Sequence, residues 1–319
     1  MVSSAWTPRA LPGQHGKTFV VTGGSSGIGY FIVEQLAATG ARVVMASRSQ
    51  ERMDAAAAAI RAHNPGARLE TIPLDLASLD SVARAAEGIL ALGGIDGLVD
   101  NAGITDLPRE RGTTSDGFEL LVGTNYLGHF ALTARSFAAL RPGARVVTLG
   151  SIAPSLSTAR PDDLLSEKHY TGFRAYATSK HATTAFAIEL DRRLRAAGLP
   201  LAALVAHPGY CIDATSERRA GINDLTGPER FFGSLLAPFT QGRDRGAWPV
   251  VRALLDPTAR GGQFYGPMFT LFGSPRPART DRQDRDLLFA AQLWQRSEQW
   301  TGVRFDPRDY PGSGIAPAA

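Results

Sequence analysis

Short apolar stretches alternate with longer amphipathic ones over most of this 319-residue chain. The apolar stretches are rich in β-branched residues, as in KTFVVT at 17–22, and this is typical of strands buried on both faces of a parallel sheet. In the longer stretches apolar residues recur every three or four positions, which indicates helices with one buried face. The pattern predicts strands at 17–22, 42–46, 68–73, 97–99, 144–149 and 200–206, and helices at 30–40, 50–63, 79–90, 118–140 and 174–197.

This alternation predicts an α/β fold, a doubly wound parallel sheet (Rossmann fold), as a single domain with a C-terminal extension. Weaker patterns after residue 210 predict a helix at 248–255, a last strand at 261–265 and an amphipathic helix at 287–300. We expect four parts along the chain. They are an N-terminal arm (1–15), a dinucleotide-binding core with the catalytic residues (16–210), a substrate-binding lid with the last strand and terminal helix (211–306), and a tail (307–319).

Composition narrows the class of protein. Hydrophobic residues make up 44% of the chain, enough for one large core. No apolar run is long enough to span a bilayer, the N-terminus lacks the apolar segment of a signal peptide, and the lone Cys211 fits a reducing compartment. We therefore expect a cytoplasmic protein. The net charge of +4 is scattered among acidic residues, and the six histidines show no metal-ligand spacing, so neither a nucleic-acid partner nor a metal site is expected.

A glycine-rich segment joins the first strand to the first helix. It consists of Gly23, Gly24, Ser25, Ser26, Gly27, Ile28 and Gly29. Strand, glycine loop and helix in this order can cradle a dinucleotide, because the glycines let the backbone approach a pyrophosphate and the helix N-terminus presents free N–H groups to it. The alternative is an ordinary glycine-rich turn between a strand and a helix.

The ends of the next two strands carry further candidate cofactor contacts. Arg48 follows the second strand, where an arginine can bind the 2′-phosphate of a dinucleotide, so we predict NADP(H) as the cofactor. The alternative is a solvent-exposed arginine ahead of the next helix. Asp75 and Leu76 follow the third strand, where the acid can accept a hydrogen bond from the adenine amino group. The alternative role for Asp75 is a helix N-cap, although Ser78 is the better candidate for that.

Tyr176 and Lys180 are four residues apart in a predicted helix, and so lie on one face. A nearby ammonium favours the phenolate and lowers the tyrosine pKa, which would make Tyr176 an acid or base usable near neutral pH. Only three of the 34 basic residues are lysines, so a lysine at 180 hints that a compact ammonium is needed there. Ser151, at the exit of the fifth strand, is a candidate partner.

The assembled motifs resemble those of the short-chain dehydrogenase/reductase family, in family order over about residues 16–210. The matching residues are the glycine segment from Thr22 to Gly29, Asp75, Asn101-Ala102-Gly103, Asn125, Ser151, Tyr176 with Lys180, and Pro208-Gly209. The run from Asn125 to Phe130 and the insertion at 162–164 resemble the retinol-dehydrogenase-like branch. Two positions depart from the family pattern: Asp100 stands where asparagine is usual, and Gly150 where serine is usual.

The resemblance implies that Tyr176 donates the proton, Ser151 places the substrate oxygen, Lys180 binds the nicotinamide ribose and lowers the Tyr176 pKa, and Asn125 holds a relay water. It also implies cofactor contacts from the glycine segment, from the strand ends and from the Pro208-Gly209 turn. The implied activity is hydride transfer between NADP(H) and a carbonyl or secondary alcohol of a lipophilic small molecule. An epimerase-type tailoring enzyme and a non-catalytic NADP(H)-binding regulator are the alternatives.

The segment after residue 210 leaves substrate recognition open. Aromatic and apolar residues such as Phe231, Leu235 and Phe272 lie among many prolines, glycines and arginines. They predict either an aromatic lid over the nicotinamide or a core and subunit contact, and the sequence does not choose between the two. A homodimer or homotetramer is possible by resemblance. The identity of the substrate and the direction of the reaction stay open.

Overall fold

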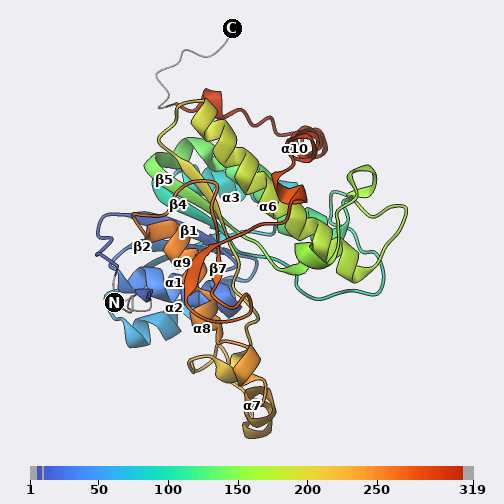
Figure 1. The fold of residues 1–319 in the computed structure, drawn as a ribbon. Coiled ribbons are helices and arrows are strands. Elements are labelled where there is room, and N and C mark those ends of the chain that lie inside the picture. The colour runs from blue at the N-terminus through green and yellow to red at the C-terminus, as the bar shows by residue number, and fades with distance from the viewer. Residues whose placement is uncertain (1–5, 9–10, 312–319) are drawn as a thin grey trace, which may run out of the picture.

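The computed structural model describes residues 6–8 and 11–311, so parts of the predicted arm and tail lie outside the described residues. An eight-stranded sheet in the order β3-β2-β1-β4-β5-β6-β7-β8 forms the centre of the molecule (Figure 1). Neighbouring strands are parallel from β3 to β7, and β8 is antiparallel to β7. The predicted α/β doubly wound sheet is confirmed.

The elements follow the predicted alternation as far as β6. The strands are β1 (Thr18–Thr22), β2 (Arg42–Ser47), β3 (Arg68–Pro73), β4 (Ile95–Asp100), β5 (Leu140–Leu149), β6 (Ala202–Ala206), β7 (Phe264–Pro267) and β8 (Pro275–Ala278). The helices are α1 (Gly27–Ala38), α2 (Gln50–His63), α3 (Leu79–Leu90), α4 (Leu120–Val122), α5 (Gly128–Ser136), α6 (Gly172–Ala196), α7 (Gly227–Ser234), α8 (Arg243–Gly246), α9 (Trp248–Leu255) and α10 (Leu287–Thr301).

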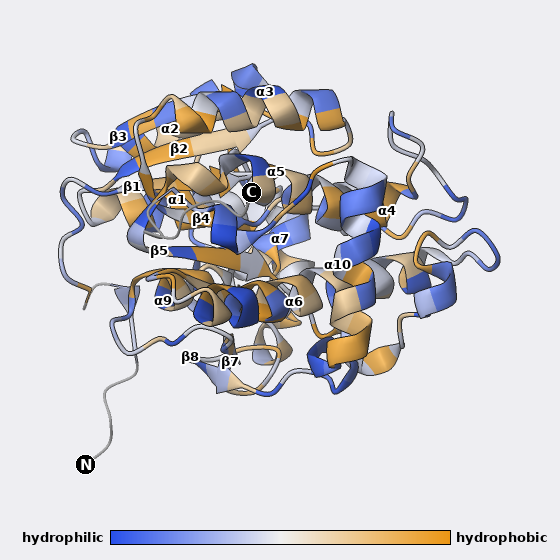
Figure 2. Cartoon of the chain, turned by 90° about the horizontal axis from the view of Figure 1, so that it is seen from above, coloured by the Kyte–Doolittle hydropathy of each residue, from blue (hydrophilic) through white to orange (hydrophobic). Residues whose placement is uncertain are grey.

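Side chains alternate between two cores, one on each face of the sheet. Val20, Val44 and Leu98 face the core under α3, α5 and α6, whereas Val21 and Val43 face the core under α1, α2 and α9. Figure 2 shows the apolar strands enclosed by helices that carry their polar residues outward. Every residue of β1 is buried, as expected for a central strand covered on both faces.

Two differences from the prediction bear on the site. The expected helix at 118–140 contains a π-helical turn, Gly123–Leu127, between α4 and α5, and its last residue already belongs to β5. An i→i+5 turn adds a residue to the helical repeat and rotates side chains locally, which hydrophobic periodicity cannot show. The antiparallel strand β8 was not predicted, because its two prolines and one arginine give no strand pattern.

The C-terminal part packs on both sides of the sheet. Trp294 of α10 lies against Phe130 and Phe186, with ring centroids 5.4 and 5.7 Å apart. Tyr310, within the predicted tail, is buried and donates its hydroxyl hydrogen to the Leu140 carbonyl. By contrast, α7 extends away from the sheet at the bottom of Figure 1. Among the described residues, no helix combines the length and apolar character needed to cross a bilayer.

Candidate active site

A cavity of about 920 Å³ lies at the carboxyl edge of the parallel strands, where β1, β2, β3, β4 and β5 end. Its lining includes all the predicted cofactor residues from the first half of the chain. These are Gly23, Ser25, Ser26, Gly27, Ile28, Gly29, Arg48, Asp75, Leu76, Asn101, Ala102 and Gly103. Ligands of open α/β sheets bind at this edge, because the strands end there and the loops diverge.

The glycine loop needs its glycines for two reasons. Gly23 and Gly27 have φ values of +67° and +58°, a left-handed region that other residues rarely adopt. A Cβ on Gly29 would lie 2.1 Å from the Gly23 carbonyl oxygen, so only glycine lets α1 begin this close to β1. The loop therefore presents bare backbone to the cavity, as a bound pyrophosphate requires. The residues present fit a nicotinamide dinucleotide.

Thr22, the last residue of β1, joins the glycine loop to the loop after β4. Its Oγ1 accepts hydrogen bonds from the backbone N–H groups of Asn101 (2.9 Å) and Ala102 (3.0 Å). The Nδ2 of Asn101 donates to the Thr22 carbonyl at 2.8 Å. These contacts hold Asn101 and Ala102 against Gly23, where a Cβ would come within 2.9 Å of the Ala102 Cα.

His129 continues this network into α5. Its Nδ1 lies 2.9 Å from the Asn125 carbonyl, which can only accept, so Nδ1 carries the hydrogen. Burial lowers the pKa of His129 to about 4, so the ring is neutral and its Nε2 accepts from the Thr22 hydroxyl at 2.9 Å. These contacts give His129 a structural role between β1 and α5.

Arg48 and Asp75 line the cavity just past the ends of β2 and β3, and their adenosine contacts stay predictions. The Arg48 side chain is exposed and lines the cavity, and Ser49, not Arg48, caps α2 by accepting from the Arg52 N–H. Asp75 accepts from the Ala77 N–H at 3.0 Å, whereas Ser78 caps α3. The alternative of Asp75 as the helix cap is therefore wrong.

Tyr176, Lys180 and Ser151 lie close together next to Leu149 and are not part of the cavity lining. The Lys180 Nζ lies 5.9 Å from the centre of the Tyr176 ring and donates to the carbonyl of Leu149, a cavity-lining residue, at 2.8 Å. Tyr176 also makes a side-chain hydrogen bond with Ser151. The three predicted residues are therefore brought together, although Ser151 and Tyr176 come from different elements.

The sequence predicts a lowered pKa for Tyr176, whereas the structure raises it. Burial raises the pKa of Tyr176, and the hydrogen bond with Ser151 opposes that rise only in part. Lys180 is itself buried, which lowers its pKa to about 8, and its ammonium is turned to the Leu149 carbonyl. The prediction that Lys180 lowers the Tyr176 pKa is thus corrected, because the sequence spacing gave no measure of how deeply both groups are buried.

Asn125 lies in the π-helical turn and is buried. Its Oδ1 accepts from the Ile104 N–H at 2.7 Å, and its Nδ2 donates to the Ile104 carbonyl and to the Ser179 Oγ. Ser179 in turn donates to the Tyr176 carbonyl at 2.7 Å. The side chain of Asn125 thus connects the loop after β4 to the helix of Tyr176. The water-relay role of Asn125 stays a prediction.

The Pro208-Gly209 turn follows β6 and is held by His207. The His207 Nε2 donates to the Thr270 carbonyl (2.9 Å), and its Nδ1 accepts from the Gly209 N–H (3.4 Å). Gly209 has φ +79°, and a Cβ there would meet the Leu271 carbonyl oxygen at 2.2 Å. The turn is therefore packed against residues 267–273.

Both departures from the family pattern have local reasons. A Cβ on Gly150 would lie 2.8 Å from Val205, so a larger residue would disturb β6. Asp100 is buried and accepts from the Thr133 hydroxyl at 3.0 Å, while its Oδ1 has no partner among the described residues. Burial raises the pKa of Asp100 to about 8. The carboxyl is therefore neutral at pH 7 and points to α5.

Sequence reasoning missed a buried pair beside Lys180. The His181 Nδ1 lies 2.5 Å from the Asp284 carboxylate, and its Nε2 lies 2.6 Å from the Ser157 carbonyl. Both ring nitrogens face acceptors, so both carry hydrogens. Burial opposes a charge on the ring, but Asp284 outweighs burial and raises the His181 pKa. The pair ties the chain after Ser151 to the C-terminal part, and no spacing could reveal it across 103 residues.

Comparison with known proteins agrees with this geometry. A family model described as short chain dehydrogenase matches residues 17–220. Polyprenol dehydrogenase of Mus musculus is 40% identical over 261 residues, covering 80% of this chain and 76% of the relative. Retinol dehydrogenase 12 of Homo sapiens is 32% identical over 298 residues, covering 91% and 88%. A short-chain dehydrogenase structure from Burkholderia cenocepacia J2315 in complex with NADP has a TM-score of 0.60 and 28% identity, covering 79% of this chain and 96% of its own.

Replacing Asp100 by asparagine should stabilise the chain at alkaline pH. The unfolded aspartate titrates near its ordinary pKa of ~3.9, whereas the folded one titrates at about 8, so the folded state loses stability as pH rises between these values. Asparagine does not titrate. In urea unfolding, the free energies of unfolding of Asp100→Asn and the wild type should differ little at pH 4. At pH 8 the free energy of unfolding of Asp100→Asn should be higher by about a few kcal/mol. An equal difference at both pH values would show that the folded carboxyl is ionised.

Removing Asp284 should destabilise the fold. Asp284→Ala leaves the buried His181 without its counter-charge, and breaking such a pair costs roughly 3–5 kcal/mol. Because the His181 pKa is raised, its contribution is fully present below the ordinary histidine pKa and is lost as pH rises through the raised value. Urea unfolding at pH 6 and pH 9 should therefore show a larger loss at pH 6. Asp162→Ala removes exposed ion pairs with Arg160 and Lys168 and is the control, with little expected loss of stability.

Proposed function

The chain belongs to the short-chain dehydrogenase family, and we propose that it is an NADP(H)-dependent oxidoreductase that acts on a carbonyl or secondary alcohol of a lipophilic small molecule. Its curated relatives place it in the retinol-dehydrogenase-like branch. The observation that carries the proposal is that Tyr176, Ser151 and Lys180 lie together beside a cavity lined by the glycine loop, where Lys180 donates to the carbonyl of the lining residue Leu149.

In this proposal the nicotinamide supplies or accepts the hydride, and the protein handles the proton. For reduction, the Tyr176 hydroxyl gives its proton to the substrate oxygen. Ser151 hydrogen-bonds to Tyr176 and orients the same oxygen. Lys180, with a pKa of about 8, is mostly charged at neutral pH and would hold the ribose hydroxyls beside Tyr176. Asn125 acts through Ser179 and the Tyr176 carbonyl, as a positioning residue.

The preference for NADP(H) rests on Arg48. Its side chain lines the cavity past the end of β2 and is exposed, and no acid stands at this strand end, where Ser47 precedes Arg48. A guanidinium there can bind a 2′-phosphate, whereas an acid would bind a ribose 2′-hydroxyl. The NADP complex of the Burkholderia cenocepacia structure supports a nicotinamide cofactor of this kind.

The lipophilic substrate class rests on the relatives and on the surface beyond the cavity. Two relatives are named for polyprenol and retinol, both long apolar alcohols. In this chain Phe269 and Met268 lie on the turn that packs against the Pro208-Gly209 loop, and both are exposed. Exposed apolar side chains on this turn suit a substrate with an apolar body.

Tyr176→Phe should lower kcat by about 100-fold or more, because it removes the proton donor and leaves the ring. NADPH oxidation with a panel of aliphatic, aromatic and polycyclic ketones would measure kcat, and fluorescence titration would show that NADPH still binds. Tyr170→Phe removes a hydroxyl bound to the Pro108 carbonyl and should leave kcat nearly unchanged. A Tyr176→Phe enzyme within tenfold of the wild type would rule out this role.

Arg48→Ala should weaken NADPH by roughly ten- to a hundredfold, since hydrogen bonds to charged groups contribute about 1.5–3 kcal/mol. Binding of NADH should change little, because NADH has no 2′-phosphate. Isothermal titration with both dinucleotides measures the two losses. Arg48→Lys keeps the charge without the planar fork and should fall between the alanine variant and the wild type. Equal losses for NADPH and NADH would contradict the 2′-phosphate contact.

A further inference from the structure

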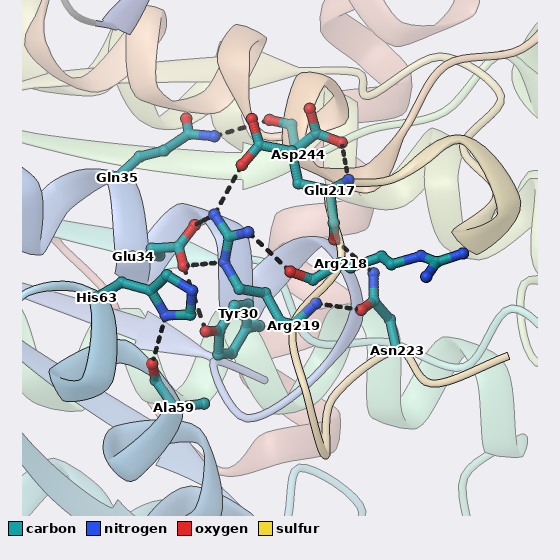
Figure 3. A network of polar contacts seen from close by, with 10 residues as sticks. All are labelled: Tyr30, Glu34, Gln35, Ala59, His63, Glu217, Arg218, Arg219, Asn223 and Asp244. Atoms are coloured by element: carbon teal, nitrogen blue, oxygen red, sulfur yellow. Dashed lines mark hydrogen bonds and ion pairs between the residues drawn. The ribbon is translucent and has the colours of Figure 1, made fainter.

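Residues 213–244, here called the clamp segment, leave the cavity after Cys211, cross α1 and return to the cavity. Arg219 binds Glu34 of α1 through two hydrogen bonds, from Nε (2.6 Å) and Nη2 (3.0 Å). Gln35, the next residue of α1, donates to the Asp244 carbonyl at 2.7 Å. Figure 3 shows both contacts side by side. The clamp segment is thus fastened to the helix whose N-terminus faces the cavity.

The Arg219–Glu34 pair is well suited to hold this segment. Both side chains are largely shielded, with 13% and 15% exposed, and the two parallel bonds fix their geometry. Arg219 also binds Glu217 at 2.7 Å, and its N–H donates to Asn223 at 2.7 Å (Figure 3). A shielded, bidentate pair contributes more than an exposed one, because water and salt screen it less.

The clamp segment positions Arg243 over the glycine loop. Arg243 begins α8, lines the cavity, and has its backbone N–H held by the Ser216 hydroxyl at 2.8 Å. Its Nη1 would lie 3.2 Å from a Cβ on Gly27, so the guanidinium lies directly over the first residue of α1. Nη2 binds the Asp213 carboxylate at 2.9 Å, and this ion pair orients the guanidinium. Nη1 has no hydrogen-bond acceptor among the described residues.

This position is where a dinucleotide places its pyrophosphate. The N-terminus of α1 offers backbone N–H groups and the positive end of the helix dipole, and Arg243 adds a guanidinium over the same loop, with Nη2 on Asp213 and Nη1 turned to Gly27. Arg48 lies past the end of a different strand, β2. The two arginines thus face different parts of one ligand: Arg48 faces the adenosine end and Arg243 the middle.

We propose that Arg243 binds the cofactor pyrophosphate and that the clamp segment, anchored by Arg219 on α1, is a cofactor-retaining element. This inference rests on the proposed function, because it takes the ligand to be a nicotinamide dinucleotide. Arg243 is a binding residue common to NADP(H) and NAD(H), whereas Arg219 acts through the segment that carries it. Two arginines that sequence analysis left unassigned thereby gain distinct roles.

The test is dinucleotide binding to the full chain, measured by isothermal titration. Arg243→Ala and Arg243→Gln should weaken NADPH and NADH by the same factor, about ten- to a hundredfold, because both ligands carry the pyrophosphate. Adenosine 2′-monophosphate lacks a pyrophosphate and should bind to Arg243→Ala as to the wild type. Arg48→Ala should show the reverse pattern, with losses for NADPH and adenosine 2′-monophosphate but not for NADH.

Arg219→Ala tests the anchor. Stopped-flow release of NADPH should be at least several-fold faster in this variant, while Arg218→Ala, an exposed neighbour, should release NADPH at the wild-type rate. Arg219→Lys keeps the positive charge, and it serves as a second variant in case Arg219→Ala does not fold. Wild-type release rates in both Arg219 variants would overturn the anchor role.

The outcomes separate this inference from the proposed function. If the wild type binds neither dinucleotide, the proposed function fails. If the wild type binds them and both Arg243 variants bind within twofold of it, the pyrophosphate contact is wrong while the proposed function stands. A loss confined to NADPH would also overturn the inference, because it would place Arg243 at the 2′-phosphate.

Discussion

One hydroxyl oxygen, Thr22 Oγ1, connects the glycine-loop side of the candidate site to the side that holds Tyr176. It accepts from two backbone N–H groups after β4 and donates to His129. His129 holds the Asn125 carbonyl, and the Asn125 side chain reaches Ile104 and Ser179, next to Tyr176 in space. Every link is buried or partly buried, so each unmade bond would carry the full cost of desolvation. The relative placement of the glycine loop and Tyr176 depends on this chain of contacts.

Burial decides the charge state of most groups in this network. It lowers the pKa of His129 and His207 to about 4 and that of Lys180 to about 8, and it raises that of Asp100 to about 8. His181 is the contrasting case, because the carboxylate of Asp284 compensates its desolvation. A buried group near Tyr176 thus stays charged where a specific partner stabilises its charge. Elsewhere buried groups are neutral, as the cost of burying an unpaired charge requires.

The part of the chain after β6 contacts both the region around Ser151 and the glycine loop. Gln283 bonds to the Ala159 backbone, and Asp284 bonds to His181, whose other ring nitrogen reaches the Ser157 carbonyl downstream of Ser151. Cys211, which precedes the clamp segment, and Arg243, within it, both line the cavity. The aromatic side chains expected as a lid are mostly exposed, with Phe239 and Phe269 at 65% and 62%. The lid over the nicotinamide and the core and subunit contact both stay predictions.

The sequence by itself determined the order of strands and helices, the glycine loop and the residues at strand ends, because these depend on local periodicity and on which residues can occupy a turn. It also identified Tyr176, Lys180, Ser151 and Asn125 as candidates, through spacing and resemblance. The tertiary structure alone decided the π-helical turn at Asn125, the raised pKa of Tyr176 and the pairing of His181 with Asp284. It also decided where Arg219 and Arg243 point. These features depend on burial and on contacts between residues far apart in the chain, and neither leaves a local pattern.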